Sequence, residues 1–168
     1  KCNKIIRKIK KIKEIRKKNN LYVGDQRTEV IFNFFYEEPS LLKLLSNKII
    51  DKFMRQKLDK YYVLQVNSAR NAIFSTNKQK SAAGYRWHKD NRFINKKSIK
   101  PNVLYSIIIC LDEFNEFNGA TEYIPNSHKS YEIFKRHQNK KNIKKILANK
   151  GDLVFLHGNL LHRVGKNL

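Results

Sequence analysis

Two separated stretches decide the fold and the site: Trp87-His88-Lys89-Asp90 and, far downstream, residues 151–162, which read GDLVFLHGNLLH. Successive side chains of an extended strand point to opposite faces, so His88 and Asp90 project to the same side. If a second strand brings His162 to that side, two imidazoles and one carboxylate can share one face of a metal ion. This donor set suits non-haem Fe(II) and leaves positions open for a substrate and O₂. We therefore expect His88, Asp90 and His162 to form a catalytic metal site.

Short apolar and β-branched runs surround these two stretches and predict strands. They occupy residues 61–66, 72–76, 84–89, 103–111, 121–124 and 152–157. Asn118-Gly119 is a typical turn between two of these runs. Since no βαβ alternation is present, the pattern favours a mainly β fold with N-terminal helices and two antiparallel sheets.

Two helices are predicted ahead of the strands. Residues 4–18 repeat Ile at helical spacing among Lys and Arg, and residues 41–54 carry an apolar stripe behind Ser40, a candidate N-cap. The basic helix at 4–18 could contact nucleic acid or an anionic membrane. The favoured interpretation is an ordinary helix that covers the core and exposes a solvated basic face. Residues 129–149, rich in Lys and Asn, are interpreted as a surface excursion with a short helix.

Length and composition predict one globular domain over residues 1–168, with a largely helical part at 1–58 and a β core at 59–168. The formal net charge of +22 ordinarily indicates a polyanionic partner. Abundant Lys, Asn and Ile are also what an AT-rich coding sequence produces, and that explanation is favoured.

The cysteines and the hydropathy of the sequence indicate in which cellular compartment the protein is expected. Cys2 and Cys110 lie far apart without paired spacing, so neither a disulfide framework nor a thiolate zinc site is indicated. Cys110 ends an apolar run and is expected to be a small core residue. A reducing, cytoplasmic compartment is therefore expected, and no apolar run approaches the length of a membrane span.

Three sequence motifs follow one another in a fixed order: WHKD at 87–90, NGATEYIPNSHK at 118–129, and the glycine-led stretch at 151–162 with Asn167 after it. With them the chain resembles the phytanoyl-CoA dioxygenase-like family of Fe(II)/2-oxoglutarate oxygenases. The resemblance implies a double-stranded β-helix, a cupin-like jelly roll that holds iron between its two sheets. It also implies His88, Asp90 and His162 as iron ligands.

The resemblance further implies an activity. With 2-oxoglutarate as cosubstrate, O₂ hydroxylates a small organic substrate while 2-oxoglutarate is converted to succinate and CO₂. No obligatory protein partner is implied. On the strand expected at 103–111, Ser106 is the polar candidate for a cosubstrate contact.

Other residues in or near these motifs are expected to have roles other than metal binding. His128 belongs to a motif that shapes a loop in the family. Asn126 replaces the family's usual Gly, in a left-handed conformation that Asn tolerates. His157 lies five residues before His162 and cannot share its face on an uninterrupted strand, so it is expected to support the site or the core. Trp87 is expected to wall the pocket or to pack in the core beside it.

The family places an Arg about ten residues beyond the distal histidine, where it pairs with the distal carboxylate of 2-oxoglutarate. Here the sequence ends at Leu168, before that position, and Arg163 should point away from the iron because it adjoins a ligand on an extended chain. The expectation is a chain truncated at its C-terminus, whose last barrel strand and anchoring Arg lie beyond Leu168. A degenerate enzyme that has lost cosubstrate binding is the alternative.

Two rival functions remain at this point. A halogenase of the same family would replace the ligand carboxylate with a small residue, and Asp90 therefore favours hydroxylation. A non-catalytic jelly-roll binding module would instead use the basic helix at 4–18 to contact nucleic acid or a membrane. No motif indicates which substrate is used.

Overall fold

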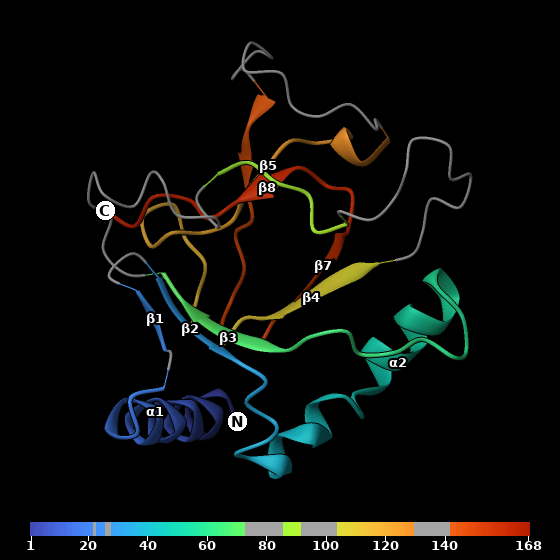
Figure 1. The fold of residues 1–168 in the computed structure, drawn as a ribbon. Helices are drawn as coiled ribbons and strands as arrows, with labels where there is room; N and C mark the ends of the chain where they lie inside the picture. Colours follow the sequence, from blue (N-terminus) through green and yellow to red (C-terminus); the bar gives the residue numbers. More distant parts are fainter. Residues whose placement is uncertain (22, 26–27, 73–85, 92–103, 130–141) are drawn as a thin grey trace. The chain divides into compact units, whose positions relative to one another are not determined.

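The computed structural model describes residues 1–21, 23–25, 28–72, 86–91, 104–129 and 142–168. The chain forms two compact units, Lys1–Ile73 and Phe74–Leu168 (Figure 1). The single domain with a change of character at residue 59 stays a prediction, and the division between the units falls later in the chain. None of the described helices has the length and apolar composition needed to cross a membrane.

The first unit begins with helix α1, Cys2–Lys18, as the Ile spacing predicts. Its apolar side belongs to a cluster that contains the buried Ile12, with Ile5 and Ile9 packed against it and Ile31 among its other members. Three of its basic side chains form ion pairs with the carboxylates of Glu29, Glu37 and Glu38. The interpretation of α1 as a core-covering helix is therefore confirmed: Ile12 is buried and Ile5 and Ile9 are partly buried against the cluster, while Ile15 is 44% exposed.

The apolar stripe at 41–54 forms two short helices and not the one expected. A 3₁₀ helix, η1, covers Pro39–Leu44, and α2 covers Lys48–Lys57. The side-chain oxygen of Asn47 accepts from the backbone N–H groups of Ile49 and Ile50 and so caps α2. The prediction of Ser40 as the N-cap is wrong, because its hydroxyl instead contacts Glu38 and Lys8.

Strands β1 (Gly24–Asp25), β2 (Thr28–Phe32) and β3 (Ser68–Asn71) form an antiparallel sheet in that order. The strand predicted at 61–66 is wrong. Tyr61 and Val63 are 76% and 81% exposed there, and residues 68–71 take the place beside β2. Strand propensity without a ladder partner and a buried face does not make a strand. Of the strand expected at 72–76, Ala72 is outside any strand and 73–76 lie outside the described residues.

The described residues of the second unit contain five short strands: β4 (Tyr105–Ile109), β5 (Glu122–Tyr123), β6 (Lys144–Lys145), β7 (Leu153–His157) and β8 (His162–Arg163). Three of them fall within the predicted runs at 103–111, 121–124 and 152–157. Strand β6 falls in the stretch interpreted as a surface excursion, of which 130–141 lie outside the described residues. Of the run at 84–89, the described residues contain one isolated bridge at His88.

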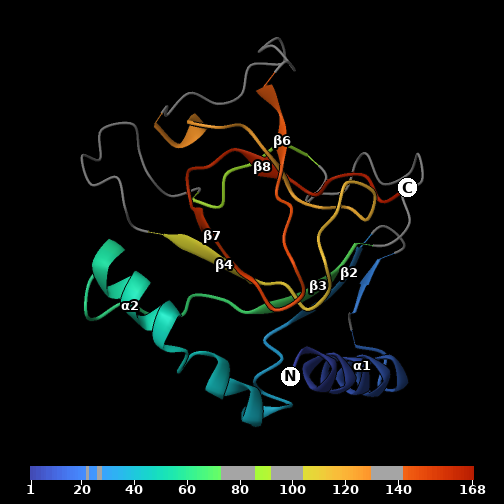
Figure 2. The ribbon, with the colours of Figure 1, turned by 180° about the vertical axis from the view of Figure 1, so that it is seen from behind.

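The pairs in the second unit are nested. From the outside inward, the backbone pairs are His88 with His162, β4 with β7, Phe114 with Ala148, and β5 with β6, all antiparallel. The labelled strands β4 and β7 lie side by side in Figure 1 and Figure 2. We call this nested series of described antiparallel pairs the ribbon; it consists of short separate sheets and isolated bridges. Because β5 also pairs with β8, the inner end of the ribbon lies beside its outer end.

The described fold is therefore β-rich, with helices and small antiparallel sheets that do not close into a barrel within the described residues. Cys110, beside β4, is completely buried, which confirms its prediction as a small core residue. Just beyond the β5–β8 pair the backbone segments approach closely, because a Cβ added to Gly165 would lie 2.3 Å from the carbonyl oxygen of Ala120. Only a glycine permits that approach, which holds the segment after β8 against the residues just before β5.

Candidate metal centre

The outer end of the ribbon places His88 directly opposite His162. Each residue donates its backbone N–H to the carbonyl of the other, at 3.0 Å in both directions. Residues that are directly opposite in an antiparallel pair project to the same face of the sheet. The two imidazole rings accordingly lie together, with their centroids 4.4 Å apart and their planes inclined by 50°.

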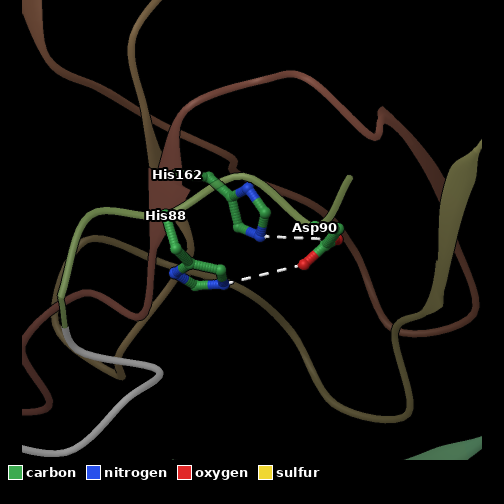
Figure 3. A group of neighbouring side chains, drawn as sticks. All are labelled: His88, Asp90 and His162. Carbon is green, nitrogen blue, oxygen red and sulfur yellow. Dashed lines mark ion pairs between the residues drawn. The ribbon is translucent and has the colours of Figure 1, made fainter. Parts of the chain in front are cut away.

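Asp90 reaches the same place because it is two residues beyond His88. One carboxylate oxygen, Oδ1, lies 3.7 Å from Nε2 of His88, and the other, Oδ2, lies 3.8 Å from Nε2 of His162. Figure 3 shows the three side chains pointing toward one another, and one ligand atom from each lies within 4.8 Å of the others. The structure therefore brings together all three residues that the sequence nominates as ligands.

The backbone fixes which nitrogen of each histidine faces the carboxylate. Nδ1 of His88 lies 2.8 Å from the carbonyl of Arg86, and Nδ1 of His162 lies 2.9 Å from the carbonyl of Leu160. A carbonyl oxygen can only accept, so both Nδ1 atoms carry hydrogen and donate. In the neutral imidazole the lone pair is then on Nε2, the atom turned toward Asp90. Metal-binding histidines are typically oriented by this kind of second hydrogen bond.

These donors fit a divalent metal ion. Two ligands at right angles, each about 2.1 Å from a metal, lie about 3.0 Å apart, whereas the two closest approaches here are 3.7 and 3.8 Å and one atom from each residue lies within 4.8 Å of the others, so the three side chains must draw together to bind an ion. The side chain of His162 is 10% exposed, whereas those of His88 and Asp90 are 25% and 30% exposed. One side of the group is therefore anchored in the protein, and the other side can admit further ligands.

Ser106 contacts the group through Asp90. Its hydroxyl, on β4, donates to Oδ2 of Asp90 at 2.5 Å. This hydrogen bond fixes the direction of the carboxylate, a role that the sequence analysis did not foresee. The alternation of β4 was the available signal, because Ser106 is the polar side chain on its face of the strand. A contact between Ser106 and a cosubstrate stays a prediction.

A close approach of backbone brings the Asp90 segment to the turn after β7. The N–H of Asn91 donates to the carbonyl of Gly158 at 2.9 Å. A Cβ on Gly158 would meet Leu104 at 2.9 Å and Asn91 at 3.2 Å. The glycine in the word HGNLLH therefore allows the segments that carry His162 and Asp90 to approach each other.

His157 and His128 lie outside the ligand group. Nδ1 of His157 accepts from the backbone N–H of Asn159 at 3.0 Å, and its ring contacts the rings of Tyr105 and His128. Burial lowers the pKa of His157, and the nearby charges of His128 and Lys89 lower it further. The lowered pKa favours the neutral form of this histidine, whose ring packs against Tyr105 and His128.

Trp87 and Arg163 occupy the opposite face, one residue away from each histidine. The Arg163 guanidinium binds the carboxylate of Glu122 at 2.7 Å and lies over the Trp87 ring, with its central carbon 4.7 Å from the ring centroid. Arg163 thus points away from the group of three, as alternation predicts. Trp87 contacts this arginine, and its expected place in the pocket wall or in the core beside it stays a prediction.

These residues define a class of centre: two histidines and one carboxylate on antiparallel strands, the donor set of mononuclear non-haem iron sites. The sequence model of the family described as phytanoyl-CoA dioxygenase (PhyH) matches residues 7–168, and the chain belongs to this family. The family is part of the Fe(II)/2-oxoglutarate-dependent oxygenases. No curated protein matches the chain at a significant level.

Proposed function

We propose that the protein is an Fe(II)/2-oxoglutarate-dependent dioxygenase that hydroxylates a small organic substrate. The observation that supports this most strongly is the donor set itself, in which both histidines present Nε2 to the Asp90 carboxylate because their Nδ1–H groups are held by backbone carbonyls. Family membership supplies the reaction class, and 2-oxoglutarate and O₂ are the proposed co-reactants.

The nested ribbon supports a jelly roll as the underlying fold. In a double-stranded β-helix of eight strands, the second strand pairs with the seventh, the third with the sixth and the fourth with the fifth. Counting the His88 segment as the second strand, the observed pairs follow this scheme: His88 with β8, β4 with β7, and β5 with β6. The proposed iron site then lies at the second and seventh strands.

In the proposed site His88, Asp90 and His162 hold the iron. When bound, the iron supplies the activation of O₂ coupled to oxidation of 2-oxoglutarate to succinate and CO₂. Ser106 keeps the Asp90 carboxylate oriented, and the backbone carbonyls of Arg86 and Leu160 keep the two imidazoles in the required tautomer. The more exposed side of His88 and Asp90 is where the cosubstrate and substrate would approach.

Two residues bear on the details of this reaction. Asp90 occupies the position that a halide would need, so oxygen rather than chlorine is the group expected in the product. Arg163 is bound to Glu122 and lies on the other face, so it does not serve as the partner for the distal carboxylate of 2-oxoglutarate.

The proposal is tested with ¹⁸O₂. The protein is incubated under ¹⁸O₂ with Fe(II), 2-oxoglutarate, chloride and a pool of small metabolites. The masses of the succinate and of any new product are then measured by mass spectrometry. We expect ¹⁸O in succinate and in a hydroxylated product. Unlabelled succinate, or a chlorinated product from the unmutated protein, would contradict the hydroxylase proposal.

A further inference from the structure

The loop after β5 contacts both segments that carry the proposed ligands, and one residue of the loop, Ser127, contacts both of them. The hydroxyl of Ser127 accepts from the backbone N–H of Leu161 at 2.9 Å. Its carbonyl oxygen accepts from the ammonium group of Lys89 at 3.2 Å. Leu161 directly precedes His162, and Lys89 lies between His88 and Asp90.

The Ser127 hydroxyl is itself held in one orientation. It donates to the carbonyl of Ile124 at 2.7 Å, which leaves a lone pair for the N–H of Leu161. Ile124 in turn donates its backbone N–H to the carbonyl of Leu161 at 3.0 Å. Leu161 is therefore bonded on both sides of its backbone by this one loop.

The local backbone explains how the loop turns to make these contacts. Asn126 has a φ of 62°, the left-handed conformation expected for this position. The turn places Ser127 in a short 3₁₀ helix, η4, Ser127–Lys129. The turn within the motif IPNSHK thus points the Ser127 side chain toward the backbone next to His162.

We propose that Ser127 is a positioning residue that sets the separation between the segment carrying His88 and Asp90 and the segment carrying His162. This inference rests on the proposed metal-binding role of those three residues. Ser127 itself lies outside the ligand group and acts through Leu161 and Lys89. Its loss leaves the N–H of Leu161, a residue only 6% exposed, without its acceptor, and a buried donor without an acceptor drives the local backbone to shift.

Metal affinity depends steeply on such supporting contacts. Changes to groups that orient metal ligands typically lower affinity about 10-fold to 100-fold. We expect Ser127→Ala to lower the affinity for Co(II), used under anaerobic conditions in place of iron, within that range. Ser127→Thr keeps the hydroxyl and is expected to restore most of the affinity. The matched control is Ser40→Ala, since Ser40 contacts Lys8 and Glu38 and should leave Co(II) binding unchanged.

Three measurements on these variants separate positioning from a purely structural role. Thermal melts show that each variant is folded, amide hydrogen exchange reports the N–H of Leu161 in the metal-free protein, and Co(II) titration gives the affinity and the ligand-field spectrum. Positioning predicts faster Leu161 exchange, weaker binding and a changed spectrum in Ser127→Ala, with recovery in Ser127→Thr. If Ser127→Ala does not fold, Ser127→Cys, whose thiol is a weaker acceptor, is expected to give an intermediate loss.

Two results would overturn the inference in different ways. Faster Leu161 exchange with unchanged Co(II) affinity and spectrum would show that Ser127 supports the loop alone. Absence of Co(II) binding in the unmutated protein would overturn the proposed metal site and this inference with it.

Discussion

Replacing His162 with alanine is expected to lower 2-oxoglutarate turnover by more than about 100-fold, because groups that merely orient a ligand already change affinity or activity by about 10-fold to 100-fold and the loss of a ligand itself should cost more. His162 is the most buried of the three proposed ligands and is tied to His88 by two backbone hydrogen bonds. Removing its imidazole leaves one histidine and one carboxylate, too few protein donors to retain iron. The measurement is succinate formation from 2-oxoglutarate with Fe(II) at saturation.

The matched control for this variant is His128→Gln. His128 contacts the ring of His157 and lies outside the ligand group, so its replacement should leave turnover within a few-fold of the unmutated protein. Turnover in His162→Ala equal to that of an unmutated protein that forms succinate would contradict the assignment of His162. A loss in His128→Gln as large as that in His162→Ala would show that the assay reports general damage.

The second large effect is expected at Gly165, on folding stability. A Cβ at this position would lie 2.3 Å from the carbonyl oxygen of Ala120, whose residue is 2% exposed. Since that oxygen belongs to buried backbone, the two segments must move apart, and overpacking of this kind costs about 1–3 kcal/mol. We expect Gly165→Ala to lower the free energy of unfolding by that amount, measured by denaturant titration.

The control for Gly165→Ala is Lys166→Ala, at the exposed neighbouring position. Substitutions at such positions usually change stability by less than about 0.5 kcal/mol. A Gly165→Ala protein as stable as the control would mean that β5 and the segment after β8 do not approach as closely as described.

Local periodicity was sufficient to predict part of the site. Period-two alternation alone places His88 and Asp90 on one face, and the structure shows both turned toward the same point. Periodicity could not predict that His162 lies beside His88, because the two residues are far apart in the sequence and meet only through the fold. That prediction came from the order of the three sequence motifs and from the fold that the family resemblance implied.

Contacts across the fold could not be predicted in this way. The bond between Ser106 and Asp90 depends on where β4 lies relative to the segment at 86–91, and the contacts of Ser127 depend on the turn at Asn126. The wrong strand prediction at 61–66 has the same origin. That run has the composition of a strand, but it is residues 68–71 that pair with β2. Composition identifies segments that can form a strand, and pairing within the fold decides which of them does.

The central claim is that His88, Asp90 and His162 hold one iron ion, and anaerobic calorimetric titration with Fe(II) tests it most directly. We expect one Fe(II) per chain in the unmutated protein and a loss of about 100-fold or more in affinity in both His88→Ala and His162→Ala, since each variant lacks a ligand and not merely a group that orients one. Unchanged affinity in both variants would contradict it.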